Sequence, residues 1–226
     1  MSDQNIDEFA KAFVSKLSGW IKSDSEIAAY LQKELLAAKP KEHPLVKRGC
    51  PVLHAERDPN SLTGEPFLGA LGRITARINR GSVIGLCGER GRGKTQIGVE
   101  VCRQATQVGL SWRFITLADL LANLRDARKM KWVSEVETLE TWRLPKVLVI
   151  DELRFSTNAD TAGDEAALLF SLVNARYGSR KDTLMIGNQD KTTFEKAVGE
   201  STVSRMEECG GVIVCNWPSY RGKAPK

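Results

Sequence analysis

The chain has 226 residues, of which 42% are hydrophobic, and it carries a formal net charge of +5. This length and apolar content suffice for one substantial core with a small appendage. Its five cysteines include no C-x-x-C pair and are odd in number, which argues against a disulfide framework and against a zinc site. No run is apolar over the length of a membrane helix, and the acidic, polar start is unlike a signal peptide, so we expect a soluble, cytoplasmic protein without membrane contact.

The charge is unevenly distributed along the chain. Residues 1–45 contain six Lys and Arg against seven Asp and Glu, so the basic excess belongs wholly to the remainder. A basic remainder favours a polyanionic partner, although a solvated basic face would give the same count.

Two helices are predicted at the amino terminus. Apolar residues recur at helical spacing over residues 5–21 and again over residues 25–38. The two prolines and the charges of residues 39–44 predict a linker. Two short helices cannot build a core alone, so this hairpin either packs on the rest of the chain or docks on a partner. We expect an N-terminal helical segment with its linker over residues 1–45 and a larger domain over residues 46–226.

From Leu45 onward, predicted helices alternate with predicted strands. Helices are expected at residues 66–80, 93–108, 116–129, 133–141 and 163–177, and strands at residues 82–87, 112–115, 146–151, 183–188 and 212–215. Thr116 and Thr192 are expected to cap the helices that follow them. Strands separated by helices predict an α/β fold with a central five-stranded parallel sheet and helices on both faces.

The most informative segment runs from Gly88 to Thr95 and reads GERGRGKT. It follows a β-branched apolar run and opens a helical pattern, which is the context of a phosphate-binding P-loop rather than of a Gly/Arg surface loop. The glycines allow backbone amides to point at phosphates, and the next helix adds the positive end of its dipole. Lys94 would reach the outer phosphates, and Thr95 would ligate Mg²⁺. With ATP and Mg²⁺ as cofactors, the predicted binding residues are Gly88, Gly91, Arg92, Gly93, Lys94, Thr95 and Gln96.

A second motif supplies the acidic groups that such a loop needs. Residues 146–150 form an apolar run that ends in Asp151 and Glu152, as expected for a buried parallel strand. Asp151 would hold Mg²⁺ together with Thr95, and Glu152 would polarise the attacking water. A buried strand that merely ends in two solvated acids is the alternative. The paired motifs predict an Mg²⁺-dependent ATPase.

The order of motifs resembles the AAA+ ATPases of the bacterial helicase-loader (DnaC) type and their relatives, the IstB transposition ATPases. The resemblance runs from about Phe67 to Lys223. It rests on the P-loop and on the segments Phe114–Leu121, Val149–Glu152, Asn174–Tyr177, Val203–Met206 and Pro218–Arg221. It implies an AAA+ fold, to which the N-terminal helical hairpin would be added.

The resemblance also implies three further catalytic residues. Asn188 corresponds to the polar residue that orients water against the γ-phosphate, although it could be an ordinary strand cap. Arg205 corresponds to the arginine finger that reaches the nucleotide of a neighbouring subunit, and Arg221 to an arginine that senses the nucleotide in its own subunit. A guanidinium suits both roles because charge spreads over the phosphoryl oxygens in the transition state. As surface arginines both would be ordinary, so these roles depend on the resemblance.

The sequence departs from the family pattern in three places. Glu89, Arg90 and Arg92 stand in the P-loop where small or neutral residues are more usual, which makes its rim basic. Gly187 stands where a hydroxyl residue is usual before the sensor asparagine. The amino-terminal segment has no zinc-type cysteine cluster.

A candidate nucleic-acid contact follows the second strand. Basic residues and one tryptophan cluster near the end of the predicted helix 116–129, namely Arg125, Arg128, Lys129, Lys131 and Trp132. In the family, an extra helical element in this region shapes a spiral assembly and faces single-stranded DNA. Phosphate tracking with a stacking aromatic would give salt-sensitive binding that tolerates any sequence. A solvated basic helix end, with Trp132 in the core, is the alternative.

The sequence therefore predicts an ATP-dependent loader of a replicative DNA helicase. Its expected partners are the helicase hexamer, contacted by the N-terminal helices, single-stranded DNA, and further copies of itself in an ATP-dependent oligomer. One alternative is an IstB-like transposition helper ATPase, which would share the nucleotide site and act with a transposase. Another is a nucleotide-gated binding adaptor with little turnover.

Overall fold

The computed structural model describes residues 43–61, 64–129 and 135–221. The chain divides into two compact units, Met1–Glu42 and His43–Lys226, and every described residue belongs to the second. The predicted helices at 5–21 and 25–38 and the start of the linker therefore lie outside the described residues. Residues 43–45, which the sequence interpretation places in the N-terminal segment, are part of the second unit, where Leu45 is buried in the core.

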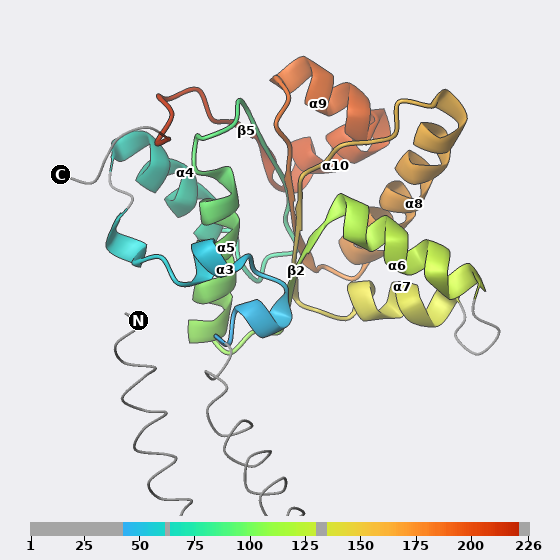
Figure 1. Ribbon diagram of the computed structural model, residues 1–226, viewed down its shortest axis with the longest axis horizontal. Coiled ribbons are helices and arrows are strands. Elements are labelled where there is room, and N and C mark those ends of the chain that lie inside the picture. Colours follow the sequence, from blue (N-terminus) through green and yellow to red (C-terminus); the bar gives the residue numbers. More distant parts are fainter. Residues whose placement is uncertain (1–42, 62–63, 130–134, 222–226) are drawn as a thin grey trace, which may run out of the picture. The chain divides into compact units, whose positions relative to one another are not determined.

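The core of the second unit is a five-stranded sheet in the order β2-β3-β4-β1-β5, and every neighbouring pair is parallel (Figure 1). The strands are β1 (Val83–Cys87), β2 (Trp112–Thr116), β3 (Val147–Asp151), β4 (Asp182–Ile186) and β5 (Gly211–Val214). All residues of β1, β3 and β4 are buried, because helices cover both faces. The predicted α/β fold with a five-stranded parallel sheet is confirmed.

Alternate side chains of each strand enter two separate hydrophobic clusters. Ile84 and Leu86 of β1 point to one face, and Val83 and Cys87 point to the other. The first face is covered by η1 (Val46–Arg48), α3 (Val52–Ala55), α4 (Glu65–Thr75) and α5 (Lys94–Gln107). The second face is covered by α6 (Leu117–Lys129), α7 (Glu135–Arg143), α8 (Ala159–Gly178), α9 (Lys191–Val198) and α10 (Glu200–Cys209). A short helix, η2 (Pro59–Ser61), precedes α4.

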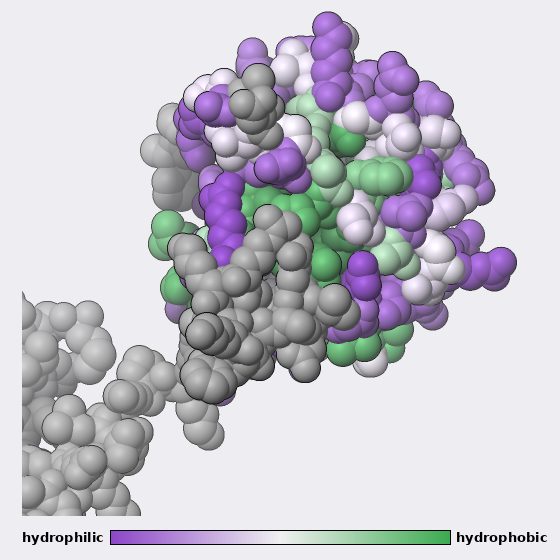
Figure 2. Space-filling model, turned by 90° about the vertical axis from the view of Figure 1, so that its right-hand side faces the viewer, coloured by the Kyte–Doolittle hydropathy of each residue, from purple (hydrophilic) through white to green (hydrophobic). Residues whose placement is uncertain are grey.

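The outer surface of the second face is largely polar. Figure 2 views the molecule from this side and shows apolar side chains gathered near the centre, within a rim of hydrophilic ones.

In the part of the chain that the structure describes, no helix combines the length and the apolar content needed to cross a membrane.

The predicted helix at 66–80 is too long, because α4 ends at Thr75. The following turn contains Asn79 and Gly81, both with positive φ angles, of 67° and 76°. Their amides donate to the carboxylate of Asp182 at 2.5 and 2.8 Å, and Ser82 N–H donates to the same group at 2.8 Å. The Asp182 carboxylate, about one hundred residues away in the sequence, thus holds the turn between α4 and β1 in a non-helical conformation.

The predicted cap at Thr192 is also wrong. The Asp190 side chain accepts the Thr193 amide at 3.0 Å and the Thr193 hydroxyl at 2.7 Å, so α9 starts two residues earlier than the capping pattern suggests. The predicted cap at Thr116 is confirmed, since its hydroxyl accepts the Asp119 amide at 3.1 Å.

A fully buried arginine fastens α8 to the sheet. Arg176 donates from its guanidinium to the carbonyl oxygens of Trp142 and Pro145, each at 2.9 Å, and of Asp182 at 2.6 Å. Its Nε donates to the Thr183 hydroxyl at 2.9 Å. Burial lowers the pKa of Arg176 to about 10. The segment Asn174–Tyr177, which contributes to the family resemblance, therefore contains a residue that anchors the fold.

Candidate nucleotide site

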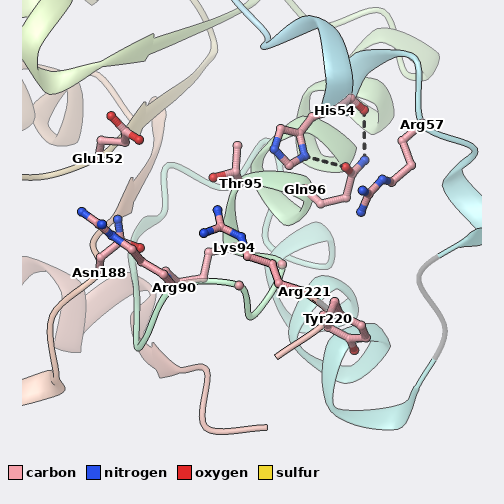
Figure 3. A pocket seen from close by; sticks show the side chains of 12 residues that line it. His54, Arg57, Arg90, Lys94, Thr95, Gln96, Glu152, Asn188, Tyr220 and Arg221 are labelled. Atoms are coloured by element: carbon pink, nitrogen blue, oxygen red, sulfur yellow. Dashed lines mark hydrogen bonds between the residues drawn. The ribbon is translucent and has the colours of Figure 1, made fainter. Parts of the chain in front are cut away.

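A pocket of about 370 Å³ lies where β1, β3 and β4 end, at the carboxyl edge of the sheet (Figure 3). It collects predicted site residues from four segments: the loop after β1 and the start of α5, the end of β3, the segment after β4, and the carboxyl-terminal stretch. The predicted residues that line it are Gly91, Gly93, Lys94, Thr95, Gln96, Glu152, Asn188 and Arg221. Crevices at the carboxyl ends of parallel strands are the usual ligand sites of such sheets.

The loop between β1 and α5 needs glycine at two close approaches. Gly88 has φ 132°, and a Cβ there would lie 2.4 Å from the Cys215 carbonyl oxygen. Gly91 has φ 82°, and a Cβ there would lie 2.3 Å from the Ser219 hydroxyl. Any larger side chain would collide with the segment after β5, and positive φ angles also favour glycine. Both the close packing and the backbone conformation therefore require glycine at these two positions.

Lys94 is buried and bends back over the loop. Its ammonium donates to the carbonyl oxygens of Gly88 at 2.6 Å and Glu89 at 2.7 Å. Burial lowers the pKa of Lys94. The positive charge thus lies inside the curve of the P-loop, at the first turn of α5.

The two acids at the end of β3 face different surroundings. Asp151 is buried, and its carboxylate accepts hydrogen bonds from the Thr95 hydroxyl and, at 2.7 Å, from the Glu152 amide. Burial raises the pKa of Asp151, while these two hydrogen bonds oppose the rise. Glu152 has φ 52° and is exposed on the pocket wall. The oxygens of Thr95 and Asp151 would suit Mg²⁺, a cation that prefers oxygen ligands.

Asn188 lies on the pocket wall two residues beyond the end of β4, so the predicted strand at 183–188 is two residues too long. The unusual Gly187 has a packing reason. A Cβ there would lie 2.7 Å from the Phe194 ring and 2.3 Å from the Gln189 side-chain oxygen. The Gln189 amide donates to the Leu153 carbonyl at 2.6 Å, so a glutamine side chain occupies the space that a residue larger than glycine would need.

The carboxyl-terminal stretch forms another wall. The Trp217 indole donates to the Arg92 carbonyl at 2.9 Å, and Tyr220 N–H donates to the Gly91 carbonyl at 2.9 Å. The Tyr220 ring meets Phe67 edge to face, with ring centroids 6.1 Å apart. These contacts bring Arg221 to the pocket, as Figure 3 shows.

Two predicted arginines do not line this pocket. Arg92 forms an ion pair with Glu89. Arg205 on α10 donates to the Asn174 side chain at 2.6 Å and lies over the rings of Phe170 and Tyr177, at 5.1 and 5.4 Å from their centroids. An arginine held on α10 is unable to act on this chain's own pocket without leaving these partners.

Four pocket residues were not among the predicted ones: His54, Arg57, Arg90 and Tyr220. Arg90 lies within the P-loop motif and Tyr220 within the segment Pro218–Arg221, so these two motifs were the sequence signals for both residues. His54 and Arg57 come from α3 and the loop after it, and a helix of four residues leaves no periodic signal. Gln96 turns toward this segment, because its amide donates to the His54 carbonyl at 3.1 Å and to Glu100 at 2.9 Å.

The proposed nucleic-acid cluster is only partly described. Arg125 forms an ion pair with Glu165, a mostly buried carboxylate on α8. The side chains of Arg128 and Lys129, together with Lys131 and Trp132, lie outside the described residues. The DNA contact in this region stays a prediction.

The parallel sheet, its strand order and the loop between β1 and α5 define an α/β fold of the AAA+ class. The chain belongs to the IstB-like ATP binding protein family, whose sequence model matches residues 73–208.

Individual relatives agree with this family. The chain is 28% identical over 137 residues to the replicative helicase loader DnaC of Escherichia coli strain K12, which covers 60% of this chain and 55% of that protein. The chain thus spans about half the length of the curated relatives it matches.

Solved structures show the same fold. A crystal structure of the DnaC helicase loader superposes with a TM-score of 0.57 at 20% identity, covering 70% of this chain and 93% of that one. The AMPPCP-bound DnaA of Aquifex aeolicus superposes with a TM-score of 0.58 at 18% identity, covering 69% of this chain and 48% of that one.

Proposed function

We propose that this chain is an ATP-dependent loader of a replicative DNA helicase and that it hydrolyses ATP in the pocket of Lys94, Glu152 and Asn188. The observation that carries the proposal is the meeting of the P-loop with the acidic end of β3 and with Asn188 in one pocket. The similarity to a replicative helicase loader supports the choice of partner.

In the proposed reaction, the Lys94 ammonium leaves the Gly88 and Glu89 carbonyls and binds the outer phosphates. Thr95 and Asp151 would hold Mg²⁺, which would neutralise phosphate charge. Glu152, exposed at the pocket wall, polarises the attacking water, and the Asn188 amide orients that water. The positive end of α5 lies at the phosphates and adds its partial charge.

Arg221 acts in the same subunit, since it enters the pocket beside Tyr220. Arg205 acts on a neighbouring copy, which is supported by its place on α10, away from this chain's own pocket. Full hydrolytic activity then requires self-association, and ATP binding is expected to promote this association. The protein works in the cytoplasm, where replicative helicases and their DNA are found.

Residues 1–45 are proposed to capture the helicase hexamer through the apolar stripe of the first predicted helix, which consists of Ile6, Phe9, Ala10, Phe13, Leu17 and Trp20. The loaded strand is proposed to be single-stranded DNA. Full-length protein is mixed with the host helicase and analysed by size exclusion. Phe13→Asp places a charge in the stripe and should abolish capture, whereas Ser15→Asp adds the same charge off the stripe and should preserve it. If Phe13→Asp still binds the helicase, the apolar stripe is not part of the interface.

The alternative that the resemblance to IstB ATPases raised is a transposition helper, and the similarity to replicative helicase loaders does not favour it. A transposition helper would share the nucleotide site and bind a transposase. Parallel co-purification with a helicase hexamer and with a transposase separates the two functions. A turnover assay with single-stranded DNA present separates both from a binding adaptor, which would bind ATP without hydrolysing it at an appreciable rate.

A further inference from the structure

The P-loop presents two arginines whose surroundings differ. Arg92 pairs with Glu89, and its carbonyl oxygen accepts the Trp217 indole N–H. Arg90 lines the pocket, and among the described residues its guanidinium has no hydrogen-bond or ion-pair partner. The fold uses one arginine within the loop and leaves the other available to a ligand.

Backbone hydrogen bonds fix the side of the pocket on which Arg90 lies. Gly88 N–H donates to the Gln189 carbonyl at 2.8 Å, which holds the start of the loop beside the segment that carries Asn188. Arg90 follows two residues later. Figure 3 draws its side chain toward Asn188, on the same side of Thr95 as Glu152, whereas Arg221 enters from the other side.

The charges that line the pocket suit a polyphosphate. Four of its side chains are cationic, namely Arg57, Arg90, Lys94 and Arg221, and the only carboxylate of the lining is that of Glu152. With Lys94 on the outer phosphates and Glu152 beside the attacking water, the terminal phosphate of ATP falls between them. That is the side on which the free guanidinium of Arg90 lies.

We infer that Arg90 is a catalytic residue, which contacts the γ-phosphate from within its own P-loop and selects ATP over ADP. The inference rests on the proposed ATPase function. In the step, the water oxygen bonds to the γ-phosphorus while the bond to the β,γ-bridging oxygen breaks, and that electron pair leaves with ADP. Glu152 takes the proton of the water. A planar guanidinium can donate two parallel hydrogen bonds to the γ-oxygens, where charge spreads in the transition state.

Arg90 therefore supplies, inside one chain, part of the stabilisation for which Arg205 needs a neighbour. The residual turnover of an unassembled chain then depends on Arg90. Selection of ATP over ADP follows from the same contact, because ADP has no γ-phosphate for this side chain to bind.

The test compares Arg90→Ala and Arg90→Lys with Arg80→Ala in the full-length chain. Arg80 is an exposed arginine that precedes β1, at the opposite edge of the sheet, so its loss changes net charge equally. Calorimetry measures affinity for ADP and for a non-hydrolysable ATP analogue. Arg90→Ala should lower the affinity for the ATP analogue by roughly tenfold to a hundredfold, which is the effect expected when a hydrogen bond to a charged group is lost. The affinity of Arg90→Ala for ADP should change by less than about threefold. Arg90→Lys should bind the analogue with an affinity between those of wild type and Arg90→Ala. Arg80→Ala should bind both nucleotides as wild type does.

Single-turnover hydrolysis should slow in Arg90→Ala when saturated with ATP. An equal loss of affinity for ADP and for the analogue in Arg90→Ala would overturn the inference, because it would indicate only a general attraction of anions. Unchanged selectivity and turnover in Arg90→Ala, with an active wild type, would overturn it as well and leave the ATPase proposal intact. A wild type that binds neither nucleotide would overturn both proposals.

Discussion

The Nδ1 atom of His54 lies 2.8 Å from the Oε1 atom of Gln96, and the Gln96 amide donates back to the His54 carbonyl. This reciprocal pair fixes α3 to the first turn of α5, so the two helices present one continuous wall to the pocket. Because the Gln96 oxygen is an acceptor, His54 carries its proton on Nδ1 in this arrangement.

Gln96→Ala should lower the free energy of unfolding by about 1–3 kcal/mol, because it removes hydrogen bonds to the partly buried His54 and to the buried Glu100. Urea denaturation measures the change. Gln104→Ala on the exposed side of the same helix is the matched control and should shift stability by less than about 0.5 kcal/mol. Similar stabilities for the two variants would show that the Gln96 contacts contribute little.

Arg176→Lys should destabilise the protein strongly although it conserves charge. A lysine has three donors on one atom and is unable to reach the separate carbonyls that the guanidinium joins, so buried acceptors lose their partners. We expect a loss of about 2–4 kcal/mol in guanidinium chloride denaturation, against less than about 0.5 kcal/mol for the exposed Arg73→Lys. A loss no larger than that of the control would contradict the anchoring role.

Lys94→Ala should abolish tight ATP binding, whereas Glu152→Gln should bind ATP and fail to hydrolyse it. The first change removes a phosphate contact, and the second removes the carboxylate that polarises water. Fluorescent-nucleotide titration and phosphate release measure the two effects. Hydrolysis by Glu152→Gln at the wild-type rate would refute the role of Glu152.

Asp151→Asn should raise the melting temperature at neutral pH in the absence of Mg²⁺. Burial raises the pKa of Asp151 above its ordinary value of 3.8, so the folded state holds this proton more tightly than the unfolded state does. Stability from this group therefore falls as pH rises from 3.8 through the raised pKa. The difference in melting temperature between Asp151→Asn and wild type should therefore become smaller as pH is lowered toward 3.8. A melting-temperature difference that is independent of pH would argue for a cause other than ionisation.

Arg205→Ala should bind ATP nearly as wild type does and hydrolyse it poorly. Mixing it with Lys94→Ala tests whether the arginine acts between subunits, because each mutant keeps the half of the site that the other lacks. Phosphate release should then rise above that of either mutant alone. If no mixing ratio restores activity while both proteins fold and assemble, the residue does not act in trans.

Sequence reasoning located the sheet because its signal is local. Each of β1, β3 and β4 is buried on both faces, so each contains an apolar run, namely Val83–Cys87, Val147–Ile150 and Leu184–Ile186, followed by a polar or glycine-rich segment. The P-loop and the Asp151–Glu152 pair were placed for the same reason, since topology brings the ends of parallel strands to one edge.

The errors arose where distant residues decide local structure. The turn that follows α4 is held by the Asp182 carboxylate, and no residue near position 75 indicates that distant partner in the sequence. His54 and Arg57 reach the pocket only because Gln96 and Arg103 bind the α3 segment, and Arg103 does so through the Ala55 carbonyl. The proposed role of Arg205 would depend on a second copy, so neither the sequence nor a single chain determines its distance to a nucleotide.

The hydrogen bonds of Trp217 and Tyr220 to the P-loop have a practical consequence for labelling. Arg221 is the last residue of this stretch that the structure describes, and it lines the pocket, so a group attached near it lies close to the proposed phosphate site. An environment-sensitive dye placed there should report nucleotide occupancy in real time, and it leaves the amino-terminal segment unmodified.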